Sequence, residues 1–168
     1  MSTNSISQAL LPEFDYEMAH LRKTLERVPE GKNDFRPHPK SMTLARLAGH
    51  LAEIPDWVSA VIDKDSLDVG APDAGMAFTM NTRADMLKRF DAGVARAHEA
   101  LARVTDARMM GIWALKHGEQ TIFAMPRVAV MRGFVLSHMV HHRAQLGVYL
   151  RMNDVPVPSI YGPSADEN

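Results

Sequence analysis

The chain has 168 residues, of which 46% are hydrophobic, and its 19 Lys and Arg against 20 Asp and Glu leave a net charge of −1. This length and composition predict one globular domain over residues 1–168 with a sizeable core. No basic run supports nucleic-acid binding, and the lack of cysteine excludes disulfides, thiolate metal ligands and a protein thiol nucleophile.

The N-terminus carries no recognisable targeting segment. Residues 1–6 have neither the basic region nor the apolar region of a signal peptide. No apolar run in the chain reaches the roughly 18 residues that indicate a membrane span. We therefore expect a soluble cytoplasmic protein with no membrane partner.

The first predicted helix runs from Leu11 to Val28 and ends at Pro29. Its apolar residues follow steps of three and four, as on the buried side of a bundle helix: Leu11, Phe14, Met18, Leu21, Leu25 and Val28. The next residues predict a loop in which prolines on both sides of His38 exclude a helix, so we expect His38 to be exposed.

A second helix is predicted to begin near Ser41 to Thr43, where hydroxyls can accept the free amides of a first turn. Its apolar stripe is Leu44, Leu47, Ala48, Leu51, Ile54, Val58, Val61 and Ile62. His50 lies on the shoulder of this stripe and can face the core. Pro55 removes one backbone hydrogen bond and should bend the helix one turn beyond His50, which would open space beside the imidazole.

Residues Asp63 to Thr79 are rich in Gly, Pro and Asp, and we expect a long surface connection that carries part of a pocket rim. A third helix should begin near Asn81 or Thr82, with Asp85 at its third position if Thr82 is the cap. Its apolar side again shows steps of three and four: Leu87, Phe90, Val94, Ala97, Leu101 and Val104. His98 lies beside this side, and we expect it to reach water.

The pattern changes between Thr105 and Met125. Residues 110–115 and 120–125 predict two short extended pieces around a polar turn that contains Gly118. Pro126 then suits the first turn of a long final helix, whose apolar side carries Met131, Val135, His138, His142, Gln145 or Leu146, and Tyr149. The C-terminal tail is extended by prolines, and its apolar residues indicate that it docks rather than floats free.

Four helical patterns of this length predict an all-α fold: a four-helix bundle with a short hairpin-like excursion before the last helix. Cofactor sites in such bundles are built from side chains that face inward.

Three histidines are candidates for a metal site. His138 and His142 lie four residues apart, so on a helix they project side by side. His50 can supply a third imidazole from another helix. Catalytic zinc sites tend to use three protein ligands and to leave one position for water or substrate. Alternatively, these are core histidines bonded to the backbone or to each other.

His141 leaves the choice of ligands open. It lies three residues from His138, so these two could also converge, on the face shared with Phe134 and Val148. The apolar side of the helix slightly favours His142. Otherwise His141 is an interface residue or supports a ligand from outside the coordination sphere.

Three further side chains are candidates for supporting roles. Glu53, one turn after His50, could accept the second ring nitrogen of a ligand or could face solvent. Gln145 lies near the ligand side of the last helix. Arg143 could orient an anionic substrate, or it could pair with a surface carboxylate or with the tail.

Three stretches of the chain together resemble the DinB family of DinB/YfiT-like metalloenzymes. They are residues 47–57 (LAGHLAEIPDW), residues 138–146 (HMVHHRAQL) and the ending over residues 149–163. The most specific part is a histidine, three residues, a histidine-arginine pair, any residue and a glutamine. The resemblance covers nearly the whole chain in the expected order.

The resemblance implies an up-up-down-down four-helix bundle, often a homodimer, with a divalent metal held by three histidines. Carried onto this sequence, the resemblance implies that the ligands are His50, His138 and His142 and that His141 is not a ligand. The metal implied is most often nickel or zinc, with manganese or iron as alternatives. Activities in the family are diverse: some relatives transfer low-molecular-weight thiols such as bacillithiol or mycothiol, one is a thiol-dependent isomerase, and many have no established activity.

We therefore predict a metal-dependent enzyme for a small-molecule substrate, either a low-molecular-weight-thiol S-transferase or a hydrolase, in which the metal activates a thiol or water. The lack of cysteine is consistent with a thiol that arrives as a co-substrate. The alternative is non-enzymatic: a metal-binding or structural homodimeric stress protein. The sequence assigns no catalytic residue.

Overall fold

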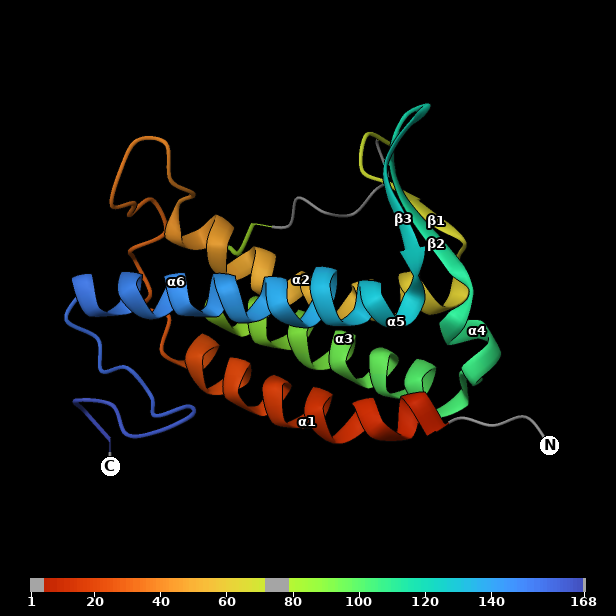
Figure 1. The fold of residues 1–168 in the computed structure, drawn as a ribbon. Coiled ribbons are helices and arrows are strands. Elements are labelled where there is room, and N and C mark those ends of the chain that lie inside the picture. Colours follow the sequence, from red (N-terminus) through yellow and green to blue (C-terminus); the bar gives the residue numbers. More distant parts are fainter. Residues whose placement is uncertain (1–4, 72–78, 168) are drawn as a thin grey trace.

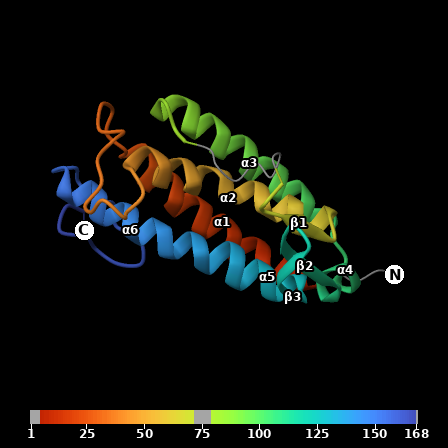
Figure 2. The same ribbon diagram turned by 90° about the horizontal axis from the view of Figure 1, so that it is seen from above.

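The computed structural model describes residues 5–71 and 79–167, and four long helical segments form the body of this part (Figure 1). They are α1 (Ser5–Glu26), α2 (Leu44–Asp63), α3 (Arg83–Arg103) and a last segment in which α5 (Arg127–Val130), the π-helix η1 (Met131–Ser137) and α6 (His138–Met152) follow one another directly. A short helix, α4 (Asp106–Met110), and a small sheet precede that last segment. Figure 2 shows the long segments side by side, with the sheet and α4 at one end and the C-terminal tail at the other.

The up-up-down-down arrangement expected from the resemblance is wrong. Ion pairs join Asp56 to Arg96 and Asp63 to Arg103, each forty residues apart, so α2 and α3 run parallel. The last segment runs opposite to α2 and parallel to α1, which makes the order up-down-down-up (Figure 1). Connections of similar length, residues 27–43 and 64–82, follow α1 and α2. The first leaves α1 and α2 antiparallel, whereas after the second α3 begins at the end where α2 began.

The predicted helix starts are confirmed where a side chain caps them. The Thr43 hydroxyl accepts the amide of Arg46 at the start of α2, and the Thr82 hydroxyl accepts the amide of Asp85 at the start of α3. The first helix instead begins at Ser5, six residues earlier than predicted. Its first amides donate to the Asp106 carboxylate of α4, a partner a hundred residues away that the local sequence does not reveal.

A three-stranded sheet makes the all-α prediction wrong at one end of the bundle. The predicted hairpin is present as β2 (Ile112–His117) and β3 (Gln120–Pro126), with Gly118 in the turn at φ 58°. The strand β1 (Ser66–Asp68) adds to β2 in parallel. It lies inside the predicted surface connection, whose residues 72–78 are outside the described residues. A three-residue strand depends on its distant partner rather than on its own sequence.

One apolar core joins the helices, the inner face of the hairpin and part of the tail. Trp113 and Leu115 of β2 are buried against it, and Val155 and Val157 of the tail pack on its edge, so the predicted docking of the tail is confirmed. His38 and His98 are exposed, as expected. Among the described helices, none is long and apolar enough to cross a membrane.

Candidate metal centre

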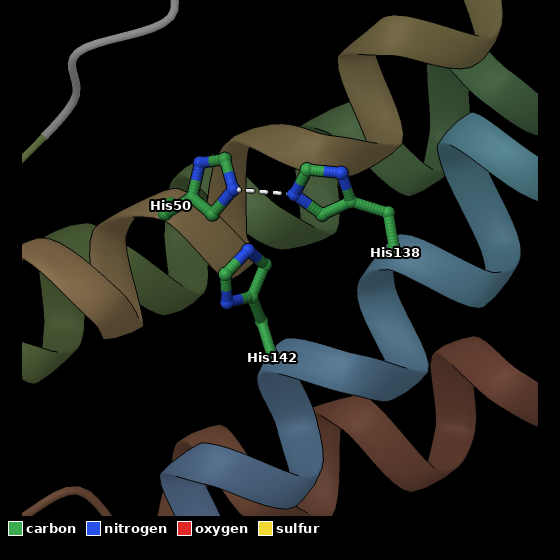
Figure 3. A group of neighbouring side chains, drawn as sticks. All are labelled: His50, His138 and His142. Atoms are coloured by element: carbon green, nitrogen blue, oxygen red, sulfur yellow. Dashed lines mark hydrogen bonds between the residues drawn. The ribbon is translucent and has the colours of Figure 1, made fainter.

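Three histidines from two antiparallel segments point toward one another inside the bundle (Figure 3). His50 comes from α2, and His138 and His142 come from the first turns of α6. One nitrogen of each ring lies within 4.8 Å of a nitrogen of both others. His50 is buried, and the other two rings are half-buried. The fold therefore brings together the three residues singled out in the sequence.

Aromatic packing holds the His138 ring. Phe134 lies in η1, one turn before His138, and stacks on Trp57 of α2 with centroids 4.9 Å apart and planes 16° apart. The His138 ring stands nearly perpendicular to both, with centroids 5.2 Å from Trp57 and 5.8 Å from Phe134. Stretches of π-helix are rare and occur often at functional sites, and this one leads directly into the ligand-bearing turns of α6.

Hydrogen bonds set which ring nitrogens face the centre. His50 donates from Nδ1 to Glu53 Oε1 over 2.8 Å, since a carboxylate can only accept from it. His142 donates from Nδ1 to the Gln145 side-chain oxygen over 2.7 Å. In both rings the Nε2 lone pair is then free to accept a proton or a metal. Histidine ligands in metal sites are usually held in this way by a carboxylate or carbonyl.

The spacing of the nitrogens fits one divalent ion. His50 Nε2 and His138 Nε2 lie 2.9 Å apart (Figure 3). Tetrahedral zinc with bonds of 2.0–2.1 Å separates its ligand atoms by about 3.3 Å. To admit an ion, this pair would separate by a few tenths of an ångström, and the wider nitrogen–nitrogen separations of the cluster, at most 4.8 Å, would close toward the same value. The same 2.9 Å spacing also suits a hydrogen bond between the two rings.

Electrostatics keeps two of the rings neutral. Burial, and then the neighbouring rings of His142, His50 and His141, lower the pKa of His138 to about 4. Burial also lowers the pKa of His142, although its hydrogen bond to Gln145 acts in the opposite direction. Neutral imidazole is the form that binds metals, so both rings are ready to do so near pH 7.

The structure separates the alternatives left open for the neighbouring residues. His141 is exposed; its ring contacts His142 but is not part of the three-histidine cluster. Glu53 is fully buried against His50, so the solvent-facing alternative is wrong for it. Gln145 is exposed and bonds to His142.

Arg143 is turned away from the histidine cluster. It pairs with Glu17 of α1 over 2.8 Å and donates to the Tyr161 hydroxyl of the tail. The prediction that it pairs with a carboxylate or with the tail is therefore confirmed. The alternative, an arginine that orients substrate, has no support in these contacts.

Arg46 is a residue of this site that the sequence argument missed. Its guanidinium lies 3.3 Å from the Glu53 carboxylate that holds His50. The spacing of residues 46, 50 and 53 was a usable signal, because residues separated by four and then three positions share one helix face.

Comparisons with known proteins agree with this fold. Residues 13–146 match the sequence profile of a family described as the DinB superfamily. No functionally curated protein shows significant similarity to the chain.

Three solved structures share the fold over more than nine-tenths of the chain. A DinB-like protein from Bacillus cereus ATCC 10987 has a TM-score of 0.69 at 22% identity, with 92% of this chain and 97% of that chain covered. The DinB-like protein YjoA from Bacillus subtilis has a TM-score of 0.65 at 16% identity, with coverage of 93% and 96%. A mycothiol-dependent maleylpyruvate isomerase has a TM-score of 0.53 at 12% identity, with coverage of 93% and 68%.

Proposed function

Because the chain belongs to the DinB superfamily and three imidazoles converge in its bundle, we propose that it is a metal-dependent enzyme whose divalent ion is held by His50, His138 and His142. The observation that carries this proposal is the convergence itself, with a nitrogen of each ring within 4.8 Å of the others. Polar side chains in a bundle core seldom gather in this way unless they satisfy one another or hold a ligand.

Different residues of the chain would have different roles at this site. The three imidazoles would hold the ion, while Glu53 and Gln145 orient two of them through Nδ1. Trp57 and Phe134 would keep water from the side of the ion beside His138. A divalent ion bound there supplies Lewis acidity that lowers the pKa of a thiol or of water. The resemblance to the family favours nickel or zinc, with manganese and iron as alternatives, and imidazole ligands suit zinc, nickel and iron.

A low-molecular-weight thiol is the co-substrate we favour. The chain has no cysteine, so it cannot supply a thiol itself. One structurally similar protein is a mycothiol-dependent isomerase, which supports a thiol in a bundle of this shape. We therefore propose transfer of such a thiol to a small electrophilic molecule, with hydrolysis as the alternative reaction.

Metal analysis tests the site first. Protein purified without a histidine tag should contain about one divalent ion per chain, as expected for one three-ligand site. The ion should be lost when His138 and His142 are both changed to Ala. A wild-type protein that cannot be reconstituted with nickel, zinc, manganese or iron would contradict the proposal.

Turnover then tests the reaction. The metal-loaded protein is offered small thiols together with electrophilic acceptors, and thioether formation is followed by mass spectrometry. A cobalt-substituted form should change its visible spectrum when the thiol is added. No turnover and no spectral change with any thiol would count against the transferase.

The competing function is non-enzymatic: a metal-binding or structural homodimeric stress protein. The 2.9 Å spacing of His50 Nε2 and His138 Nε2 favours it, because the rings can satisfy each other without an ion. Light scattering on the purified protein tests the homodimer, which we propose for either function. A metal-free dimer that resists reconstitution would favour the structural alternative.

A further inference from the structure

We propose that Arg46 is a positioning residue that acts through Glu53 to fix the orientation of His50. This inference rests on the proposed metal centre and adds to it the group that holds its most buried ligand. It concerns three side chains of α2: Arg46, His50 and Glu53.

A single oxygen atom links the three side chains. Glu53 Oε1 accepts from His50 Nδ1 at 2.8 Å and lies 3.3 Å from the Arg46 guanidinium nitrogen Nη2. The residues are separated by four and three positions, so they share one face of α2. The guanidinium, the carboxylate and the imidazole therefore form a chain of polar contacts that ends at the proposed metal centre.

Because the Glu53 carboxylate is buried, it needs a compensating charge, and Arg46 supplies one. The Glu53 side chain is 0% exposed, whereas that of Arg46 is 27% exposed. A carboxylate removed from water is costly unless a charge and hydrogen bonds compensate it. Arg46 brings the compensating charge from the solvent edge of the bundle to the buried acid. The place of the Glu53 carboxylate thus depends on Arg46 as well as on His50.

The contact with Glu53 also selects one tautomer of His50. A carboxylate offers only acceptors, so His50 must carry its proton on Nδ1 and direct the Nε2 lone pair toward His138. His142 is held by Gln145, whose amide can accept or donate. His50 is therefore the ring whose ligating form is set by a charged group.

Three variants separate positioning from simple support of the fold. Arg46→Met removes the guanidinium, Arg46→Lys keeps a cation, and Glu53→Gln keeps the shape but can donate as well as accept. The matched control is Arg96→Met. Arg96 lies in α3, and its loss breaks an exposed pair with Asp56 of α2, the helix that carries Arg46. Thermal unfolding of all four metal-free proteins checks that each is folded.

The first readout is the His50 ring itself, followed by nitrogen-15 NMR in the metal-free protein and assigned with a His50→Gln variant. Wild-type and control proteins should show one tautomer with a slowly exchanging Nδ1 proton. Glu53→Gln should show a mixture of tautomers. In Arg46→Met that proton should exchange with water faster than in the wild-type protein, and Arg46→Lys should restore most of the protection.

The second readout is the affinity for zinc, measured by competition with a chelator. Changes to the outer partners of a metal ligand typically weaken binding by about 10–100-fold, and we expect this for Glu53→Gln and Arg46→Met. Arg46→Lys should recover part of the loss, and Arg96→Met should match the wild type.

Wild-type proton exchange and wild-type zinc affinity in Arg46→Met would overturn the inference. Failure of the proposed function gives a different result, because the wild-type protein itself would then bind no zinc. The state of the His50 ring in the metal-free variants would still decide whether Arg46 positions it.

Discussion

The decisive feature at the residue scale is that each candidate ligand has a different support. His50 is held by a buried carboxylate, His142 by an exposed amide and His138 by perpendicular packing against two aromatic rings. An imidazole binds a metal only through an unprotonated nitrogen, so these contacts decide whether each ring presents such a nitrogen to the metal. The neighbouring His141 is outside the cluster although its ring contacts that of His142.

Single alanine substitutions should separate the cluster from its neighbour. We expect His50→Ala, His138→Ala or His142→Ala each to weaken zinc binding by more than about 100-fold, since a lost ligand costs more than a lost outer partner. His141→Ala should stay within about threefold of the wild type, as expected for a residue outside the coordination sphere. Metal content after dialysis measures this. An equal loss in His141→Ala would contradict the assignment of the three ligands, and no loss in any variant would mean that the ion binds elsewhere.

At the scale of secondary-structure elements, a buried arginine ties the sheet to the helices. Arg127 begins α5 directly after β3 and is only 2% exposed. Its guanidinium donates to the carbonyls of Val61, Lys64 and Ile112 and to the Asp65 carboxylate. One side chain thus joins the end of α2, the hairpin and the start of the segment that carries His138 and His142.

Removing this junction should destabilise the fold strongly. Arg127→Met removes the bonds that Arg127 donates to three carbonyls, although that of Lys64 keeps its bond from Arg108, and we expect a loss of about 3 kcal/mol in the free energy of unfolding. Urea unfolding of the metal-free protein measures it. Arg103→Met is the control, because Arg103 is 60% exposed where it pairs with Asp63, and exposed pairs contribute at most about 1 kcal/mol. Similar losses in the two variants would refute this account of the junction.

The same junction should respond to acid. The guanidinium of Arg108, and then that of Arg127, hold the pKa of Asp65 below its ordinary value of 3.8. A folded-state pKa below the unfolded one stabilises the fold above the unfolded value, and that contribution is lost as the pH falls through the folded-state pKa. Asp65→Asn should therefore unfold at a Tm that declines less than that of the wild type below about pH 4. Parallel Tm curves from pH 6 to pH 2 would show that Asp65 contributes nothing.

At the scale of the whole molecule, the histidine cluster joins two segments that are far apart in the chain. His50 and His138 are separated by 88 residues, and they meet because α2 and the last segment run antiparallel. An unfolded chain does not hold these rings together, so a metal that binds them stabilises only the folded state.

Metal removal should therefore lower stability in a way that depends on the cluster. With zinc at 100 times its dissociation constant, we expect about 2.7 kcal/mol of added stability in the wild-type protein. Chelation should reverse the gain. His138→Ala should melt at the same Tm with and without zinc, and calorimetry measures each case. A zinc effect of equal size in that variant would place the stabilising ion at another site.

Much of the fold was accessible from local sequence patterns. Steps of three and four among apolar residues predicted the long helices, and the hydroxyls of Thr43 and Thr82 predicted two of their starts. The change of pattern after Thr105 predicted the hairpin. These signals are short-range, because a cap or an amphipathic helix depends on residues only a few positions away.

The sequence by itself determined which histidines could meet, since their spacing and their place beside the apolar side of two helices are local properties. Only the tertiary structure decided that α2 and α3 run parallel, that β1 joins the sheet, that Glu53 is buried beneath Arg46 and that Arg143 faces α1. Each of these depends on a partner or a solvent boundary set by packing. A residue's burial and its hydrogen-bond partners follow from how the segments are arranged, and the local pattern does not contain that arrangement.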